Sequence, residues 1–479
     1  MSRGPPHQRT IFAKLINASF GLLADQGGTI AVMMALVLPI LVGGLGLGFE
    51  ATNWYLKSRA MQNAADAAVI AAASNNGTNF DAEAKAVAAQ YGFVDGSNNV
   101  TVTTSKSAIC PTGANLNTPC YSVKISGIVP LYLSQVIGFQ GDATLNDGRA
   151  KALSSTAVAN LNTINQTICL LTLDTSGQAL RTNGAPNSNF IGCTVMSNAD
   201  AVCNGSNLNA WFGLAAGTST DCGNRQRSNV PVVADPYSGM AENLPENTCT
   251  SYPQETGNGK NSTLPASNQW AGNLSISLSD TLTGVPSSKN YTGVMFCGDV
   301  QLTEDVTIHT PDDTEGAVIV IENGQLDLNG HTLRTADGSA VTIVFSGTNG
   351  SYLHHPSDNS VGQGGVFDIQ ASSSPKAPFP GIAIYQDPNL NTGVDFTYKG
   401  NNPQWLISGG VYLPKANITI NGDVSQSSNG ADCFVMVTNT VLINGTSNIY
   451  QQSPAGAGCK LAGLAMPTIK INGRGTLVY

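Results

Sequence analysis

The stretch Thr29–Phe49, which reads TIAVMMALVLPILVGGLGLGF, decides the fold of the N-terminal part of the chain. No charged residue lies between Asp25 and Glu50. As an α-helix these 21 residues are about 31 Å long, which matches the hydrocarbon thickness of a bilayer. Pro39 and the glycines that follow it would weaken a helix in water, but lipid-embedded helices tolerate such residues. The sequence therefore predicts a transmembrane helix at residues 29–49.

A secretory signal peptide is the competing interpretation. Its apolar core would have about 7–15 residues and would be followed by a small-residue cleavage site. The span here is longer and lacks such a site, which favours an uncleaved anchor. Basic residues lie on both sides of the span, with a slight excess before it, and this indicates a cytoplasmic segment at residues 1–28. These residues are Arg3, Arg9 and Lys14 before the span, and Lys57 and Arg59 after it.

The ten cysteines all lie on one side of the span, and their number is even. This distribution indicates disulfides in an oxidising compartment and so places the bulk of the chain outside the cytoplasm. There is no CxxC pair and no Cys/His spacing typical of zinc. The nearest neighbours in sequence, Cys110 with Cys120 and Cys203 with Cys222, are the natural pairs, but the sequence does not define the connectivity. The candidates are Cys110, Cys120, Cys169, Cys193, Cys203, Cys222, Cys249, Cys297, Cys433 and Cys459.

Helical periodicity continues beyond the span. Trp54 and Tyr55 lie where interfacial aromatic residues are common. A small-residue face then recurs at intervals of three and four residues, and Asn75-Asn76-Gly77 is a typical helix stop. This alanine-rich face suits either self-association with a partner helix or packing on the chain's own exported domain, and both remain open. Its residues are Met61, Ala64, Ala65, Ala68, Val69 and Ala72.

The segment Asp25–Ala73 resembles the N-terminal region of TadE/TadG-like Flp pilus-assembly proteins. The resemblance is carried by the glycine pair before the span, by ALVLP at residues 35–39, and by QNAADAA at residues 62–68. It implies a bacterial inner-membrane protein of the tight-adherence system, with other pilus-assembly or envelope proteins as partners. Processed pilins of that system carry Glu at the fifth position after the cleaved glycine, whereas that position is Met33 after Gly28 and Val32 after Gly27. The chain is therefore more similar to the unprocessed, anchored TadG type.

TadG proteins often carry a von Willebrand A domain with a DxSxS metal site. The corresponding stretch here is Asp174-Thr175-Ser176-Gly177-Gln178, in which Gln178 replaces the second serine. A simple turn is the stronger interpretation, and we predict no metal and no cofactor.

The fold class that we predict is mainly β. The transmembrane helix continues into a long helix, residues 50–160 form a small pilin-like α+β module, and residues 161–289 form a loop-rich β region with disulfides. In the module we expect a helix at Phe80–Tyr91, strands at Val100–Thr104 and Tyr121–Ile128, and a short helix at Val129–Phe139. Residues 290–479 contain short apolar runs separated by Asn-Gly turns, which favours a right-handed parallel β-helix; a β-sandwich or jelly roll is the alternative.

The charge pattern and the acidic residues exclude some functions. Charged residues make up 11% of the chain and the net charge is −9, without a basic run that could follow a phosphate backbone, so no nucleic-acid binding is expected. Asp312, Asp313 and Glu315 lie in a turn-like stretch and are more typical of solvated residues than of a catalytic pair. The pair His354-His355 would point to opposite faces of a strand.

Two functions follow as hypotheses. The first is a membrane-anchored, non-catalytic structural or assembly component of a Flp-type pilus or envelope complex. The second is a membrane-tethered β-helix that binds or cleaves carbohydrate. Under either hypothesis the lipid bilayer is a partner, and the C-terminal domain is periplasmic or exported.

Overall fold

The computed structural model describes residues 27–75, 79–111, 119–146, 148–184, 187–190, 192–256, 264–284, 290–311, 315–357, 364–390, 395–398, 404–421, 425–426, 433–445, 448–450, 459 and 463–478. The chain forms two compact units. Unit 1 contains Met1–Ile164 and Asn472–Tyr479, and unit 2 contains Asn165–Ile471. Unit 2 is therefore inserted into the sequence of unit 1.

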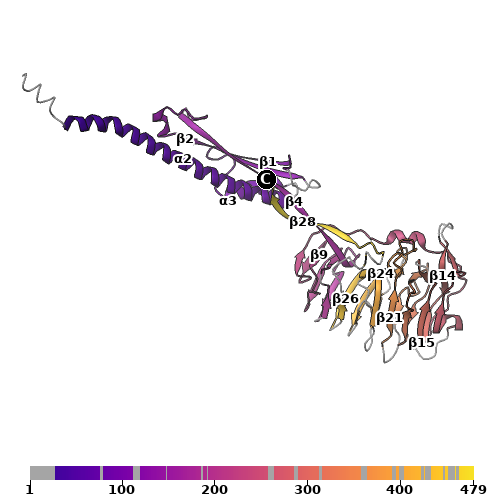
Figure 1. Ribbon diagram of the computed structural model, residues 1–479. Coiled ribbons are helices and arrows are strands. Elements are labelled where there is room, and N and C mark those ends of the chain that lie inside the picture. The colour runs from indigo at the N-terminus through magenta and orange to yellow at the C-terminus, as the bar shows by residue number, and fades with distance from the viewer. Residues whose placement is uncertain are drawn as a thin grey trace, which may run out of the picture. The chain divides into compact units, whose positions relative to one another are not determined.

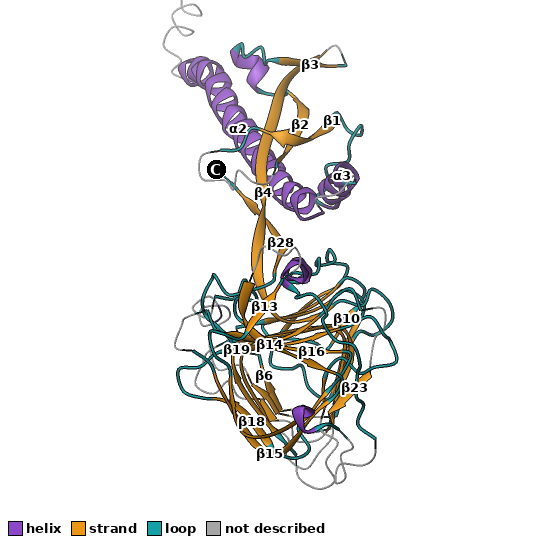
Figure 2. Ribbon diagram, turned by 90° about the vertical axis from the view of Figure 1, so that its right-hand side faces the viewer, coloured by secondary structure: helices purple, strands orange, loops and turns teal. Residues whose placement is uncertain are grey.

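Unit 1 consists of a long helix packed on an antiparallel sheet (Figures 1 and 2). Strand β2 pairs with β1 on one side and with β4 on the other, and β3 and β28 also pair with β4. Its elements are α2 Gly27–Asn75, α3 Phe80–Gln90, β1 Val100–Ala108, β2 Cys120–Pro130, the 3-10 turn η1 Ser134–Ile137, β3 Ala143–Leu145, and the parts of β4 Gly148–Thr172 and β28 Thr468–Leu477 that lie within the unit.

Helix α2 covers the predicted span and continues to Asn75, so the prediction of one long helix is confirmed. Pro39 lies inside it. From Met61 to Ala73 one face of α2 is buried against the sheet, because small side chains recur there at the helical period. The packing partners include Val102, Val123 and Ile125.

The predicted short helix at Val129–Phe139 is wrong for most of its length. Val129 and Pro130 belong to β2, because that strand pairs with β4 as far as Pro130. Only Ser134–Ile137 is helical, as a single 3-10 turn. The predicted helix and the two predicted strands of the module correspond to α3, β1 and β2.

Unit 2 is a large, mostly parallel β-region. Its strands after β4 are β5 Leu180–Asn183, β6 Asn187–Asn189, β7 Thr194–Ser197, β8 Ala201–Asn204, β9 Phe212–Ala215, β10 Ser219–Thr220, β11 Arg225–Arg227, β12 Gln269–Ser275, β13 Thr281–Thr283, β14 Asn290–Cys297, β15 Val300–His309, β16 Ala317–Glu322, β17 Leu326–Asp327, β18 Thr332–Thr335, β19 Val341–Ser346, β20 Pro356–Ser357, β21 Val366–Gln370, β22 Ile382–Gln386, β23 Asp395–Tyr398, β24 Gln404–Asn421, β25 Ser425–Gln426, β26 Phe434–Asn444 and β27 Asn448–Tyr450. The short 3-10 turns η2 Ser238–Asn243 and η3 Ala266–Asn268 lie between β11 and β12.

Two long series of parallel neighbours run through unit 2, and a shorter third series runs β23–β24–β26–β5–β8–β10. The first long series runs β14–β16–β19–β22–β24–β26 and continues through β4–β7–β9–β11. The other long series runs β12–β15–β18–β21–β24–β25–β27–β6. Figure 1 shows the sequence of neighbours from β14 and β15 through β24 and β26 to β9. Jelly rolls are built from antiparallel strands, so this pairing does not support the predicted sandwich alternative.

The spatial order of the strands is not their order in the sequence. Strand β4 lies in the middle of the first series, where it pairs with β26 on one side and with β7 on the other. Leu170 is paired with Met436, and Leu180 is paired with Val441. The predicted boundary between residues 289 and 290 is therefore not a boundary of the structure, because strands from both sides of it share one sheet.

The interior of unit 2 is a ladder of aliphatic side chains in register. Each member is at most 2% exposed and pairs with the next across the parallel strands. Burying such a side chain stabilises the fold by roughly 1.5–3 kcal/mol, so the ladder is a main source of cohesion between the strands. Its members are Ile319, Ile343, Ile384, Val411, Met436, Leu170 and Val195.

Residues 231–255, which we call the covering segment, run across the opposite face of the same strands. Asp235 accepts a hydrogen bond from the Tyr412 hydroxyl at 2.8 Å, and the carbonyl of Tyr237 accepts one from the Tyr385 hydroxyl at 3.2 Å. Both tyrosines of the sheet are fully buried. This part of the sequence, which was predicted to be rich in loops, is therefore a segment that covers one face of the sheet.

Candidate functional site

The apolar part of α2 is exposed along most of its length. Leu36 is 67% exposed and Ile40 is 74% exposed, although both are large aliphatic residues. The helix from Ile30 to Asn75 is long and apolar enough to cross a membrane. A contiguous apolar surface of this size is typical of a surface that contacts lipid or another protein.

A carboxylate lies at the end of this apolar stretch. Glu50 is 3% exposed and accepts backbone hydrogen bonds from Tyr132 at 2.6 Å, from Leu133, and from Ser134 at 3.2 Å. These three N–H groups lie just before η1 or at its first residue. The first N–H groups of a helical turn have no acceptors within the turn, so they need a partner elsewhere. Glu50 therefore holds residues 131–139, which we call the capped loop, against α2.

The capped loop also packs on the helix through side chains. A Cβ atom built at Gly46 would lie 2.5 Å from the Leu133 Cβ, so only a glycine permits this close approach. The rings of Trp54 and Phe139 have their centroids 5.7 Å apart. Gly44 and Gly48, on other faces of the helix, have no neighbours within 4 Å of such a Cβ.

The alanine-rich face has a partner within unit 1. Ala64, Ala65 and Ala68 are fully buried and form one core with residues of β1 and β2. Of the two alternatives left open by the sequence, the structure shows packing on the chain's own domain for this part of the helix. The buried face of the stretch from Met61 to Ala73 is therefore occupied by the chain's own sheet.

Five disulfides join all ten cysteines. Two of the bonds join the sequence neighbours that spacing suggested, and one bond, between Cys110 and Cys120, lies in unit 1. The pairs are Cys110–Cys120, Cys169–Cys193, Cys203–Cys222, Cys249–Cys297 and Cys433–Cys459. Each bond closes a loop, which reduces the entropy of the unfolded chain.

The candidate metal and catalytic residues do not converge. Asp174 accepts hydrogen bonds from the backbone N–H and the hydroxyl of Ser176, both at 3.0 Å, which is an ordinary turn. No group of three His, Cys, Asp or Glu residues within the described ranges could hold a metal ion. Asp312 and Asp313 lie outside the described residues. Glu315 is exposed.

The paired histidines are buried in different environments. The His354 Nε2 atom lies 3.3 Å from the Asn323 Oδ1, whereas the His355 Nδ1 atom lies 2.7 Å from the Pro356 carbonyl oxygen. Burial lowers the pKa of each histidine to about 4, and the charge of His355 contributes to the lowering at His354. Both rings are therefore neutral at pH 7.

A buried carboxylate lies at the end of β16. Glu322 is 3% exposed and accepts a hydrogen bond from the Asn247 side chain at 2.6 Å. Burial, together with the neighbouring Asp387, raises the pKa of Glu322 to about 7. Sequence patterns gave no sign of this residue, because it occupies an ordinary strand position in VIVIE.

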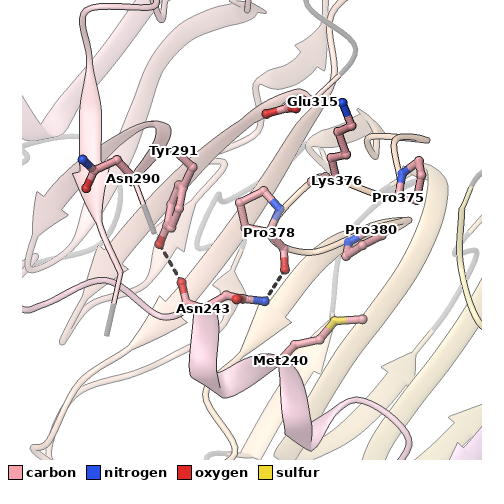
Figure 3. Close-up of a pocket in the computed structure, with 10 residues that line it drawn as sticks. Met240, Asn243, Asn290, Tyr291, Glu315, Pro375, Lys376, Pro378 and Pro380 are labelled. Atoms are coloured by element: carbon pink, nitrogen blue, oxygen red, sulfur yellow. Dashed lines mark hydrogen bonds between the residues drawn. The ribbon is translucent and has the colours of Figure 1, made fainter. Parts of the chain in front are cut away.

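A pocket of about 470 Å³ lies between the covering segment and residues 375–380 (Figure 3). The Tyr291 hydroxyl donates to the Asn243 carbonyl at 2.7 Å, and the Asn243 amide donates to the Pro378 carbonyl at 2.6 Å. Among the lining residues that the structure describes, Glu315 is the one carboxylate. Burial also raises the pKa of Tyr291, which keeps its hydroxyl protonated.

Comparison with known families gives a match to helix α2. Residues 28–75 match the family model described as "Putative Flp pilus-assembly TadE/G-like". The chain thus carries a TadE/G-like pilus-assembly domain, and this domain coincides with α2.

A solved structure of the competence-associated pilin ComZ from Thermus thermophilus also matches. The identity is 10%, the match covers 80% of this chain and 88% of that chain, and the TM-score is 0.22. A similarity at this low TM-score supports no conclusion about the fold or function of the chain. Comparison with curated proteins finds no match.

Proposed function

We propose that this protein is a membrane-anchored structural or assembly component of a Flp-type pilus or envelope complex and performs no catalysis. The observation that carries the proposal is the TadE/G-like domain at residues 28–75, on a helix whose apolar side chains are exposed from Ile30 to Phe49. In this proposal the bilayer covers those side chains, and the partners are other pilus-assembly or envelope proteins. Met33, where processed pilins have Glu, supports an anchored TadG-type chain.

The proposed topology has residues 1–28 in the cytoplasm of a bacterium and unit 2 outside the inner membrane. The disulfides support it, because all of them follow the span and require an oxidising compartment. For unit 2 we propose a parallel β-helix, which the series of parallel neighbours support. Such a solenoid would display a long surface.

A matched pair of substitutions tests the anchor and the function together. Leu36→Arg places a charge in the span, where it should oppose insertion by roughly 2.5–3.5 kcal/mol. Leu56→Arg makes the same change at a residue of similar exposure, 67% against 60%, beyond the span. Each variant is expressed in a strain that lacks the native gene.

We expect the deletion strain to lose pili and surface adhesion, and the wild type and Leu56→Arg to restore them. Leu36→Arg should leave the membrane fraction and restore neither. If the deletion strain still makes pili and adheres, the assembly role is wrong. Binding of a glycan by the purified chain, together with normal piliation of the deletion strain, would favour the carbohydrate hypothesis instead. A cytoplasm-specific reporter that is active after residue 479 would contradict the topology.

A further inference from the structure

The capped loop lies beside the end of the apolar span. Leu133 is packed against Gly46, which precedes Phe49 by three residues, or about 4.5 Å along a helix. When residues 29–49 fill the hydrocarbon layer, Leu133 lies at the depth of Gly46, just inside its edge. The loop is fixed at this level by Glu50 and by the contact between Trp54 and Phe139.

The most exposed large side chains of the capped loop are aromatic or aliphatic, and none is charged. Tyr132 is 70% exposed, Leu133 is 39% exposed and Phe139 is 38% exposed. No Asp, Glu, Lys or Arg occurs between Lys124 and Asp142. Aromatic residues beside a membrane span are typical of the boundary between hydrocarbon and headgroups.

Several backbone N–H groups of the loop have acceptors within the protein. The N–H groups of Tyr132, Leu133 and Ser134 donate to Glu50, and Leu131 donates to the Arg149 carbonyl at 3.0 Å. At the far end of η1, Phe139 donates to the Ser134 carbonyl at 3.1 Å. A loop in water could leave such groups to the solvent, whereas a loop in lipid cannot, because each unsatisfied group there costs several kcal/mol.

From this position, surface and internal hydrogen bonding, we propose that the capped loop is a second membrane contact. Tyr132, Leu133 and Phe139 enter the bilayer beside the span, so unit 1 touches the membrane at two points and not by the helix alone. The proposal rests on the anchor role proposed above, because the depth of the loop is defined by the span.

Single-cysteine labelling of the full chain tests the proposal. The native cysteines are all in disulfides within the described residues, so one added cysteine can be labelled selectively with an environment-sensitive fluorophore. The probe positions are Tyr132→Cys and Phe139→Cys. Tyr91→Cys, which changes a 54% exposed tyrosine at the end of α3, is the matched aqueous control, and Leu36→Cys is the lipid control. The protein is reconstituted in phosphatidylcholine–phosphatidylglycerol vesicles with or without brominated acyl chains.

We expect brominated lipid to quench the labels at residues 132 and 139 nearly as strongly as the label at residue 36. Aqueous iodide should quench these labels several-fold less than the label at residue 91. If residue 36 is quenched by lipid while both loop positions behave like residue 91, the second contact is wrong and the anchor stands. If residue 36 is itself open to iodide and untouched by brominated lipid, the anchor fails and the loop proposal fails with it.

Discussion

A single methyl group added at Gly46 should loosen the capped loop. The new Cβ would meet the Leu133 Cβ at 2.5 Å and the Leu133 Cδ1 at 2.9 Å. The Leu133 Cβ is attached directly to the backbone, so rotating the side chain cannot relieve the first contact. The loop must move away from α2, and the hydrogen bonds that Glu50 accepts must lengthen.

The magnitude follows from two opposing effects. Replacing a helical glycine with alanine stabilises a helix by roughly 0.5–1 kcal/mol. Overpacking at a tight contact costs about 1–3 kcal/mol. We therefore expect Gly46→Ala to destabilise the loop by up to roughly 2.5 kcal/mol, with about 1.4 kcal/mol as a middle value. Gly44→Ala and Gly48→Ala, which meet nothing within 4 Å, should be neutral or slightly stabilising.

Hydrogen exchange of the full chain in detergent, read by mass spectrometry over residues 131–139, measures this effect directly. A loss of about 1.4 kcal/mol corresponds to roughly tenfold faster exchange of the protected N–H groups. The two neighbouring glycine variants control for general effects on the helix. If Gly46→Ala exchanges at the same rate as Gly44→Ala, the close packing of the loop on α2 is not present in the protein.

Three further predictions concern other parts of the molecule. Glu50→Gln should speed exchange over the same loop, because one amide oxygen replaces a carboxylate that accepts three N–H groups; unchanged protection would contradict the capping role. The Glu322 carboxyl has a pKa of about 7 in the folded state against 4.5 in the unfolded state, so its ionisation destabilises the fold as the pH rises from 4.5 to 7. Glutamine cannot ionise, so Glu322→Gln should be more stable than the wild type by up to roughly 3 kcal/mol at pH 8 and equally stable at pH 4. Thermal unfolding at both pH values measures this, and a gain that does not depend on pH would refute it. Replacing Cys203 and Cys222 together by serine should lower stability by about 2–4 kcal/mol, measured by the same method, and an unchanged melting temperature would refute the predicted role of that bond.

Local sequence patterns predicted the elements that depend mainly on residues close together in the sequence. The apolar run from Thr29 to Phe49 and the alanine periodicity after it predicted α2, and the short apolar runs from residue 290 onward predicted parallel strands. The pairing of Leu170 with Met436 could not be predicted, because nothing near either residue specifies a partner so far away in the sequence. The same reason explains why the insertion of unit 2 into unit 1 was missed.

The candidate site was predictable in part. The apolar span was found because its composition is unusual. The role of Glu50 depends on where β2 ends and where η1 begins. The sequence predicted one helix over both, so these positions were not correctly predicted. Gly46 was one glycine among several, and only the position of Leu133 distinguishes it from Gly44 and Gly48.

The insertion of unit 2 has a consequence for how the protein is made. Strand β28 completes the sheet of unit 1, and Gly475 there donates to the Ser74 hydroxyl at 2.9 Å. A ribosome synthesises β28 only after the whole of unit 2, so β4 has an open edge until then. Open edges pair readily with other chains. We expect nascent chains to need protection at this edge until β28 is made. Chains that stop within unit 2 should be removed by proteases, because the sheet of unit 1 then lacks β28.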